Sequence, residues 1–447
     1  MTREWRALLS GEDAERARSV AREIATRLTT PELIESTLAD TGRRLAESGA
    51  HARGWSRAGL SGAGSSAALL CAQLDRSEPG AGWDRRGHVG LSAAAEAAGR
   101  GATPLGLFDG LAGLGFSATL LAAGRPRYGG MLASVDDVLT SATSSRCAEL
   151  AKARGLPVRE WDLISGITGV GVHLLGRREL PAQRDALGQV LVTLVALATD
   201  DGEPPRWATP AEHLYVNLRE LTPAGNVNCG LAHGVPGPLA LMSLALEAGV
   251  EVPGQAEAVR RTADWLAAQA LPGRFGPEWP AAVPLGDGAV RAGRKHAAPA
   301  LPGWCYGNAG VARAFWLSSR ALGDRALTET ALDALRQALE RQRSERPLGA
   351  PTLCHGTAGL AQVSLRVAAE SGDQDVAGGA RSLCLELVES FDAGAPLGYR
   401  DITAGRGEPR LAVDDPTLLA GAAGTALVLL AAADDHDPEW DRALLLS

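Results

Sequence analysis

The sequence contains few aromatic residues, few methionines and no block of like charges. Phe, Trp and Tyr make up 4% of its 447 residues, and only 3 residues are Met. This composition excludes a core built mainly from large aromatic side chains. The formal net charge is −8, so the chain has no excess of the basic residues that a nucleic-acid backbone requires. We therefore expect no nucleic-acid partner.

Long apolar runs and closely spaced cysteines are also missing. The longest apolar run, residues 418–433, has 16 residues, fewer than the roughly 20 that a transmembrane helix needs. The N-terminal residues contain no apolar core of a secretory signal. The 6 cysteines lie far apart, and in a reducing compartment such cysteines are more often buried, metal-bound or catalytic than bridged. We expect a cytoplasmic protein without a transmembrane segment.

Glycine is abundant, with 54 residues, and many of these glycines belong to an internal repeat. A Gly-x-x-Gly pair followed by an apolar run occurs seven times, at Gly59/Gly62, Gly110/Gly113, Gly166/Gly169, Gly234/Gly237, Gly307/Gly310, Gly356/Gly359 and Gly421/Gly424. The spacing averages about 60 residues, which leaves room for two helices and their connections. A repeat of this length predicts one supersecondary unit per glycine pair.

Each repeat combines an apolar segment with an amphipathic one. Two of the pairs are followed by largely apolar segments, residues 114–121 and 360–367. In residues 257–270, by contrast, apolar residues recur with helical periodicity among polar ones. We expect an all-α protein, an (α/α) toroid of seven helical hairpins with about fourteen helices. Glycines three residues apart would let the inner helices approach one another around a common axis. No polar capping repeat is evident, which favours a closed ring over an open, non-enzymatic solenoid.

The repeats also predict the domain organisation. Residues 1–58 precede the first glycine pair and are expected to form a helical lead-in that packs on the toroid, which would span residues 59–447. Three Pro- and Gly-rich segments, 199–227, 272–303 and 392–417, are expected to be long loops. Loops of this length inside a compact domain are usually functional or mobile, and each of these precedes an inner helix.

Reactive residue types gather directly before the glycine pairs. Cys305 and Cys354 stand two residues before the first glycine of neighbouring repeats, and His355 follows Cys354. Two thiolates and one imidazole suit Zn²⁺, and three protein ligands leave a fourth position open, as in catalytic zinc sites. The alternative is a purely structural role, in which these cysteines pack as small hydrophobic residues. Their common register favours the zinc site.

Three further residues lie at the same rim of the repeats. His233 directly precedes its glycine pair and is a candidate general acid or base, a fourth metal ligand or a structural histidine. Asp162 lies four residues before its pair, where a carboxylate could orient His233 or simply cap a helix. Tyr306 could donate a hydrogen bond into the site or merely pack.

These motifs resemble those of the lanthionine synthetase C (LanC) family of cyclases. The resemblance is carried by Trp304-Cys-Tyr-Gly-Asn-Ala-Gly310, Leu353-Cys-His-Gly-Thr-Ala-Gly359, Gly230-Leu-Ala-His-Gly234 and Trp161-Asp-Leu-Ile-Ser-Gly166. It covers residues 59 to the C-terminus and implies the same double-layered α/α toroid. It also implies that Zn²⁺ is bound by Cys305, Cys354 and His355, and that His233, Asp162 and Tyr306 line the catalytic centre.

The resemblance further implies a reaction. The substrate would be a precursor peptide whose Ser and Thr residues have been dehydrated, and the product a lanthipeptide with thioether rings. Zn²⁺ would hold a peptide cysteine as thiolate for addition to dehydroalanine or dehydrobutyrine. We expect His233 to protonate the resulting enolate, with Asp162 setting its tautomer. A separate dehydratase would supply the substrate.

One stretch departs from the family pattern. LanC cyclases have an arginine shortly before the Trp-Cys-Tyr-Gly motif, but residues 299–303 read Pro-Ala-Leu-Pro-Gly, and the nearest basic residues are Arg291, Arg294, Lys295 and His296. Two alternatives therefore stay open: an enzyme that adds glutathione or another free thiol to dehydrated residues, and a non-catalytic scaffold that binds a peptide or a dehydratase. A terpenoid-type toroid is disfavoured, because the sequence has no Asp-rich metal motif and few aromatic residues.

Overall fold

The computed structural model describes residues 4–49, 55–214, 216–286, 299–403 and 411–447. The chain divides into two compact units. The first contains residues 1–104, 108–133 and 345–441, and the second contains residues 105–107, 134–344 and 442–447.

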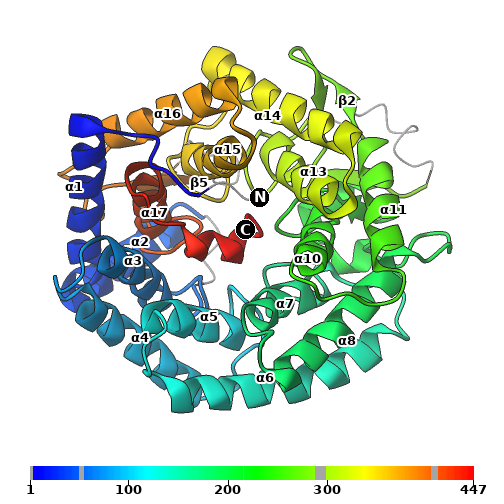
Figure 1. Cartoon of the computed structure of the whole chain (residues 1–447), viewed down its shortest axis with the longest axis horizontal. Coiled ribbons are helices and arrows are strands. Elements are labelled where there is room, and N and C mark those ends of the chain that lie inside the picture. Colours follow the sequence, from blue (N-terminus) through cyan, green and yellow to red (C-terminus); the bar gives the residue numbers. More distant parts are fainter. Residues whose placement is uncertain (1–3, 50–54, 215, 287–298, 404–410) are drawn as a thin grey trace. The chain divides into compact units, whose positions relative to one another are not determined.

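Helices dominate both units (Figure 1). The first unit contains α1 (Gly11–Leu28), α2 (Pro31–Glu47), α3 (Ala63–Ser77), α4 (Trp83–Gly99), α5 (Leu111–Ala122), α15 (Thr357–Ser371), α16 (Gln374–Glu389), α17 (Ala422–Ala433) and the strands β5 (Arg400–Thr403) and β6 (Leu411–Asp414). The second unit contains most of α6 (Gly129–Leu150) and of α14 (Arg325–Glu345), together with α7 (Ile167–Gly176), α8 (Pro181–Ala198), α9 (Val216–Leu221), α10 (Pro236–Glu247), α11 (Gln255–Ala267), α13 (Asn308–Leu322) and the strands β1 (Asn226–Asn228), β2 (Leu271–Pro272), β3 (Pro277–Glu278) and β4 (Ala282–Pro284).

The helices that follow the glycine pairs are largely buried, and α17 is buried on every side. All 12 residues of α17 are buried, and the sequence of this helix is almost entirely Ala, Leu and Val. A helix that is apolar all round must be enclosed by protein. The helices that cover such segments are amphipathic: in α1 the buried residues Ala14, Ala17, Ala21 and Ile24 recur at intervals of three or four and define one face.

Within each unit, inner and outer helices pair as the repeat predicts. In the first unit α3 packs against α4 and α15 against α16, and in the second α7 packs against α8 and α10 against α11. The described residues that follow the inner helix α17, 434–447, contain no α-helix. Figure 1 shows α1 lying along α17, so the N-terminal helix takes the outer position of the last hairpin.

The paired glycines are required by the loop that precedes each inner helix. A Cβ on Gly356 would lie 2.2 Å from the carbonyl oxygen of Ala350, and one on Gly424 would lie 1.9 Å from that of Leu418. Both carbonyls belong to the residue six positions earlier, so the loop folds back tightly onto the start of the helix. The sequence predicted that the glycines allow close approach between inner helices; for Gly356 and Gly424 the closest atom belongs to the residue's own loop, and for Gly424 the next closest is Cδ1 of Leu353 in the preceding repeat.

Short antiparallel strand pairs occur in the segments expected to be loops. β1 pairs with β4 through Val227 opposite Val283 and Asn228 opposite Ala282, and β5 pairs with β6 through Asp401 opposite Val413. These ribbons hold residues of the rim in fixed positions. In the part of the chain that is described, no helix is long and apolar enough to cross a membrane.

Candidate active site

The rim loops of the second unit carry an aspartate–histidine pair. Asp162 is 1% exposed, and its Oδ1 accepts hydrogen bonds from the backbone N–H groups of Ser165 (2.8 Å) and Gly166 (2.9 Å) at the start of α7. Its Oδ2 lies 2.6 Å from Nδ1 of His233, in the loop before α10. Asp162 therefore fixes the loop that leads into α7 and holds a histidine at the same time.

The Asp162 carboxylate fixes which nitrogen of His233 can exchange a proton. An ionised carboxylate only accepts hydrogen bonds, so Nδ1 of His233 must carry a hydrogen and donate it. Proton exchange is then assigned to Nε2. The His233 side chain is 39% exposed. A solvent-accessible imidazole that is held in one tautomer has the properties of a general acid or base.

Tyr306 lies in the same unit, in the loop before α13. Its hydroxyl oxygen accepts a hydrogen bond of 3.1 Å from Nδ2 of Asn228, the last residue of β1. The neighbouring Cys305 is 8% exposed and has a free thiol. The backbone N–H of Ala232, next to His233, donates to the carbonyl of Cys305 at 3.4 Å. The loops before α10 and α13 are thus joined directly.

In the first unit, Cys354 and His355 occupy the loop before α15. Nε2 of His355 donates to Oδ1 of Asp401 at 3.0 Å, and Asp401, in β5, is 2% exposed. The hydrogen bond to Asp401 and a second one to Cys354 raise the pKa of His355 to about 10. The His355 side chain is 41% exposed. Because Asp401 occupies Nε2, Nδ1 is the nitrogen that remains for a metal ion.

The remaining cysteines are poor candidates for chemistry. Burial raises the pKa of the Cys71, Cys229 and Cys384 thiols to about 12. Thiols with such pKa values stay protonated near neutral pH and do not act as nucleophiles or ligands.

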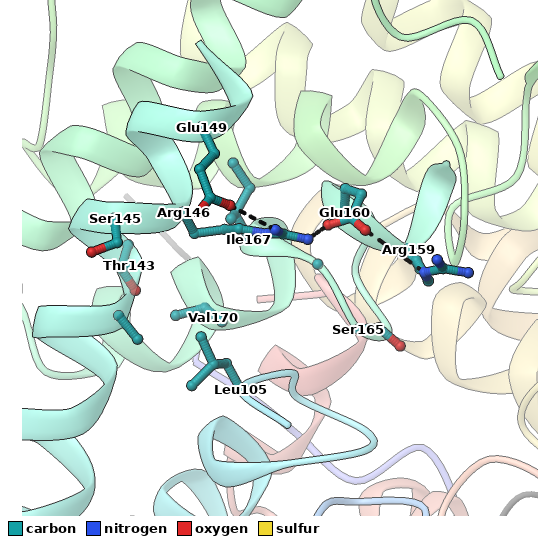
Figure 2. Close-up of a pocket in the computed structure, with 12 residues that line it drawn as sticks. Leu105, Thr143, Ser145, Arg146, Glu149, Arg159, Glu160, Ser165, Ile167 and Val170 are labelled. Atoms are coloured by element: carbon teal, nitrogen blue, oxygen red, sulfur yellow. Dashed lines mark hydrogen bonds and ion pairs between the residues drawn. The ribbon is translucent and has the colours of Figure 1, made fainter. Parts of the chain in front are cut away.

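A pocket of about 510 Å³ adjoins the aspartate–histidine pair in the second unit (Figure 2). It lies between α6 and the loop that starts α7. Its lining includes the apolar side chains of Leu105, Ile167 and Val170 and the row of ion-paired residues Glu149, Arg146, Glu160 and Arg159. Ser165 also lines the pocket. The backbone N–H of Ser165 donates to Asp162, so a residue of the pocket wall is bonded directly to the aspartate–histidine pair.

Two residues that contact the predicted ones are not predicted from the sequence. Asp401 binds His355, and Asn228 binds Tyr306, but neither lies next to a glycine pair in the repeat register. Asp401 lies in the short strand β5 and Asn228 in the short strand β1. Neither strand shows the clear alternation of apolar and polar residues by which a strand is predicted from sequence. The basic residues named as substitutes for the family arginine, Arg291, Arg294, Lys295 and His296, lie outside the described residues.

Comparisons with known proteins agree with this architecture. The family model of the lanthionine synthetase C-like protein matches residues 55–445, so the chain belongs to this family. Among solved structures, nisin cyclase matches with a TM-score of 0.72 and 17% sequence identity, over 92% of this chain and 96% of that chain. No curated protein sequence matches the chain. The predicted fold class, an all-α protein of the α/α toroid type, and the predicted family are confirmed.

Proposed function

We propose that this protein is a zinc-dependent lanthipeptide cyclase. It would add cysteine thiols of a dehydrated precursor peptide to dehydroalanine or dehydrobutyrine and so close (methyl)lanthionine thioether rings. The observation that carries the proposal is the hydrogen bond between His233 and Asp162 in a chain of the lanthionine synthetase C-like family. The loop that holds His233 is itself hydrogen-bonded to the loop that holds Tyr306. A separate dehydratase would supply the substrate, and a reducing cytoplasm would keep the peptide thiols free.

The donor atoms of three rim residues fit a zinc ion. Cys305, Cys354 and His355 offer two sulfur atoms and one imidazole nitrogen, a set that could hold one metal ion. The Nε2–Asp401 hydrogen bond supports this assignment, because histidines that bind metals usually donate their second N–H to a carboxylate. When bound, Zn²⁺ stabilises the thiolate form of a coordinated peptide cysteine near neutral pH.

His233 would supply the proton that completes the addition. A new S–C bond forms at the β-carbon of the dehydro residue, and the electron pair of the C=C bond moves to the enolate. The doubly protonated His233 then gives its Nε2 proton to the α-carbon while Nδ1–H stays on Asp162. The proton lost by the peptide thiol passes to solvent and balances the step. Asp162 keeps Nε2 directed to the substrate and stabilises the imidazolium.

The pocket beside Ser165 would take a neighbouring part of the peptide. Its volume of about 510 Å³ can hold one or two side chains, and its apolar wall would bind an aliphatic or aromatic residue. Because both reacting groups lie on one chain, holding the peptide here would raise their effective concentration.

A peptide that carries one cysteine and one dehydroalanine tests the function. Ring closure leaves the mass unchanged but removes the free thiol, so alkylation followed by mass spectrometry counts the rings. We expect the wild-type protein to close the ring and His233→Ala to be slower by about 10²-fold or more. His88→Ala, a change on the exposed surface of α4, is the matched control and should cyclise normally.

Two outcomes of this assay would contradict the proposal. If added glutathione formed intermolecular adducts while the peptide thiol stayed free, the protein would be a thiol-adding enzyme rather than a cyclase. If peptide bound but neither product formed, it would be a scaffold. Normal cyclisation by His233→Ala would refute only the role of His233.

The proposed zinc site is tested by the zinc content of the protein and by its affinity for zinc. Purified protein should contain one zinc ion per chain, and Cys305→Ala should lose it. Asp401→Asn should bind zinc about 10- to 100-fold more weakly, because the histidine ligand loses the carboxylate that orients it. Competition with a chromogenic chelator measures this affinity without any substrate. A zinc-free wild-type protein that still cyclises the peptide would refute the metal assignment.

A further inference from the structure

We propose that Arg146 determines the specificity of the pocket beside the aspartate–histidine pair, so that the pocket accepts uncharged side chains of the peptide and excludes charged ones. This inference rests on the proposed function, because the bound side chain belongs to the precursor peptide. The observation that carries it is that one guanidinium group pairs with two carboxylates of the pocket wall.

The loop that carries Asp162 also forms part of the pocket wall. Glu160 lies two residues before Asp162 and Ser165 three residues after it, and both line the pocket. The N–H of Ser165 donates to Oδ1 of Asp162 at 2.8 Å, and Oδ2 of the same carboxylate binds His233. A peptide whose dehydro residue receives its proton from His233 would therefore place an adjacent residue at this pocket.

Arg146 joins the two acidic residues of the wall. Its Nη1 donates to Glu149 at 2.9 Å on the next turn of α6, and its Nη2 pairs with Glu160. The Glu160 side chain is 15% exposed and the Arg146 side chain 39% exposed, so water reaches this pair only in part. In Figure 2 the Arg146 side chain runs between the two carboxylates, and Leu105 and Val170 lie below it in this view. The pocket therefore combines an ion-paired wall with an apolar one.

The charges of the described pocket wall cancel. Two of its residues are basic and two are acidic: Arg146, Arg159, Glu149 and Glu160. Arg159 lies 3.7 Å from Glu160, so the second arginine is also close to a carboxylate. An uncharged side chain can enter without disturbing these pairs. A lysine or glutamate side chain would lose part of its hydration and find every opposite charge of the described wall already paired. The pocket should therefore select uncharged residues.

Removing charge of one sign should switch this preference. Arg146→Met keeps a long side chain but leaves the two carboxylates with Arg159 as the only basic residue of the described wall, so the pocket should favour lysine. Glu149→Gln combined with Glu160→Gln has the opposite effect: both arginines lose their carboxylates, and the pocket should favour glutamate. Because the two changes act in opposite directions, a general loss of activity cannot imitate the expected result.

Peptides that differ in a single residue measure the preference. Each carries one cysteine, one dehydroalanine and, next to the dehydroalanine, norleucine, lysine or glutamate. The series is made twice, with this residue before or after the dehydroalanine. The ratio of kcat/KM between two peptides is taken on one protein, so a partly unfolded variant still gives a valid ratio. Arg154→Met is the matched control, because Arg154 pairs with Asp200 at 2.8 Å and does not line the pocket.

We expect the wild type to prefer norleucine by about 5-fold over lysine and over glutamate in one of the two series, the size of a single partly exposed ion pair. Lysine should become better than norleucine in Arg146→Met, and glutamate should do so in the double glutamine variant. Arg154→Met should keep the wild-type order. A wild type indifferent to charge, an order that stays unchanged in either pocket variant in both series, or an equal change in Arg154→Met would overturn the proposal.

Salt provides a readout that a change of shape would not move. The preference of Arg146→Met for lysine should fall as the salt concentration rises from about 50 to 500 mM, because salt screens partly exposed charges. A preference that did not depend on salt would mean that the substitution altered the shape of the pocket and not its charge, which would overturn the proposal.

Unreactive peptides separate this inference from the proposed function. Dye-labelled peptides with alanine in place of dehydroalanine cannot form a ring, and fluorescence anisotropy gives their dissociation constants. These constants should follow the same order as kcat/KM in each protein. If the wild type bound the peptides in the expected order but closed no ring, the proposed function would fail alone. If rings closed without the expected order, only the role of Arg146 would fail.

Discussion

Asp162 uses its two oxygen atoms for two separate tasks. Oδ1 accepts from two backbone N–H groups at the start of α7, and Oδ2 binds His233. These two N–H groups belong to the loop that leads into α7, so losing Oδ1 would remove their hydrogen bonds and destabilise the fold. Losing the charge on Oδ2 would instead change the tautomer of His233. The structural and the functional role can therefore be separated by substitution.

We predict that Asp162→Asn lowers the cyclisation rate by about 10²- to 10⁴-fold while the protein remains folded. The amide oxygen still accepts from the N–H groups of Ser165 and Gly166, but its NH₂ group now faces Nδ1 of His233 and forces the opposite tautomer. Asp162→Ala should lose activity and, in addition, about 1 kcal/mol of stability or more, because Ser165 and Gly166 lose the acceptor of their N–H groups. Thermal unfolding and the thiol-alkylation assay distinguish the two. Equal activity of Asp162→Asn and wild type would contradict the orienting role.

At this scale the sequence predicted the residues that share the repeat register and missed those that do not. Cys354 and His355 stand at a fixed distance before a glycine pair, and so does His233. Asp401 reaches His355 from β5, after a segment that appeared to be a loop. Its position depends on pairing between two short strands, and such pairing is set by tertiary contacts more than by local sequence.

At the scale of the helix and its loop, the second glycine of three pairs, Gly169, Gly310 and Gly424, lies against a leucine side chain of the preceding repeat. In the last repeat an added Cβ on Gly424 would lie 1.9 Å from the Leu418 carbonyl oxygen and 2.6 Å from Cδ1 of Leu353, in the preceding repeat. The glycine pattern was readable from sequence, since it recurs. Its cause was not, because nothing in the sequence shows that the loop folds back over the helix start.

We predict opposite effects for two glycine-to-alanine substitutions in the first unit. Gly424→Ala should destabilise the protein by roughly 2 kcal/mol or more, because neither the backbone carbonyl nor the packed leucine can move away easily. Gly378→Ala, in the exposed interior of α16 with no atom within 4 Å, should stabilise it by about 0.5–1 kcal/mol. Urea unfolding of both variants provides the comparison. A harmless Gly424→Ala would show that the close approach is not needed.

A buried ion cluster between α6 and α7 should make stability depend on pH. Asp136 accepts from Nε2 of His173 at 2.9 Å and from the Arg177 guanidinium. Burial alone would raise the pKa of Asp136, but these hydrogen bonds outweigh it and hold the pKa below its usual value. A carboxylate with a lowered pKa contributes stability above the unfolded-state value, near pH 4, and loses it as the pH falls through the folded-state pKa.

We predict that Asp136→Asn is less stable than wild type at pH 7 by about 2 kcal/mol, the size of a charge-assisted hydrogen bond. The difference should shrink once the pH falls below about 4, since protons then bind to this carboxylate in the unfolded chain and, at lower pH still, in the folded protein. Asp137→Asn, the exposed neighbour, should change stability little at any pH. Urea unfolding at several pH values measures all three proteins. A difference that stayed constant with pH would contradict the titration of Asp136.

At the scale of the whole chain, the N-terminal segment completes the last hairpin of the first unit. The final turn of α17 leaves carbonyl groups without helical partners, and residues near the N-terminus satisfy them. The indole N–H of Trp5 donates to Ala431, and the N–H groups of Leu8 and Leu9 donate to Ala432. Arg18 of α1 binds Asp434 at 2.7 Å. The sequence predicts residues 1–58 only as a helical lead-in that packs on the toroid, because helix periodicity does not reveal a partner more than 400 residues away.

If α1 belongs to the cooperative core, damage to its buried face must destabilise the fold as strongly as damage to an inner helix. Ile24 of α1 is fully buried, so Ile24→Ala should cost about 2–5 kcal/mol of unfolding free energy. Val89→Ala, on the exposed face of α4, should change it by less than about 0.5 kcal/mol. Urea unfolding followed by Trp fluorescence and by circular dichroism should give coincident transitions in both variants. A separate early transition confined to Ile24→Ala would mean that α1 unfolds by itself and that α17 remains stable without its outer helix.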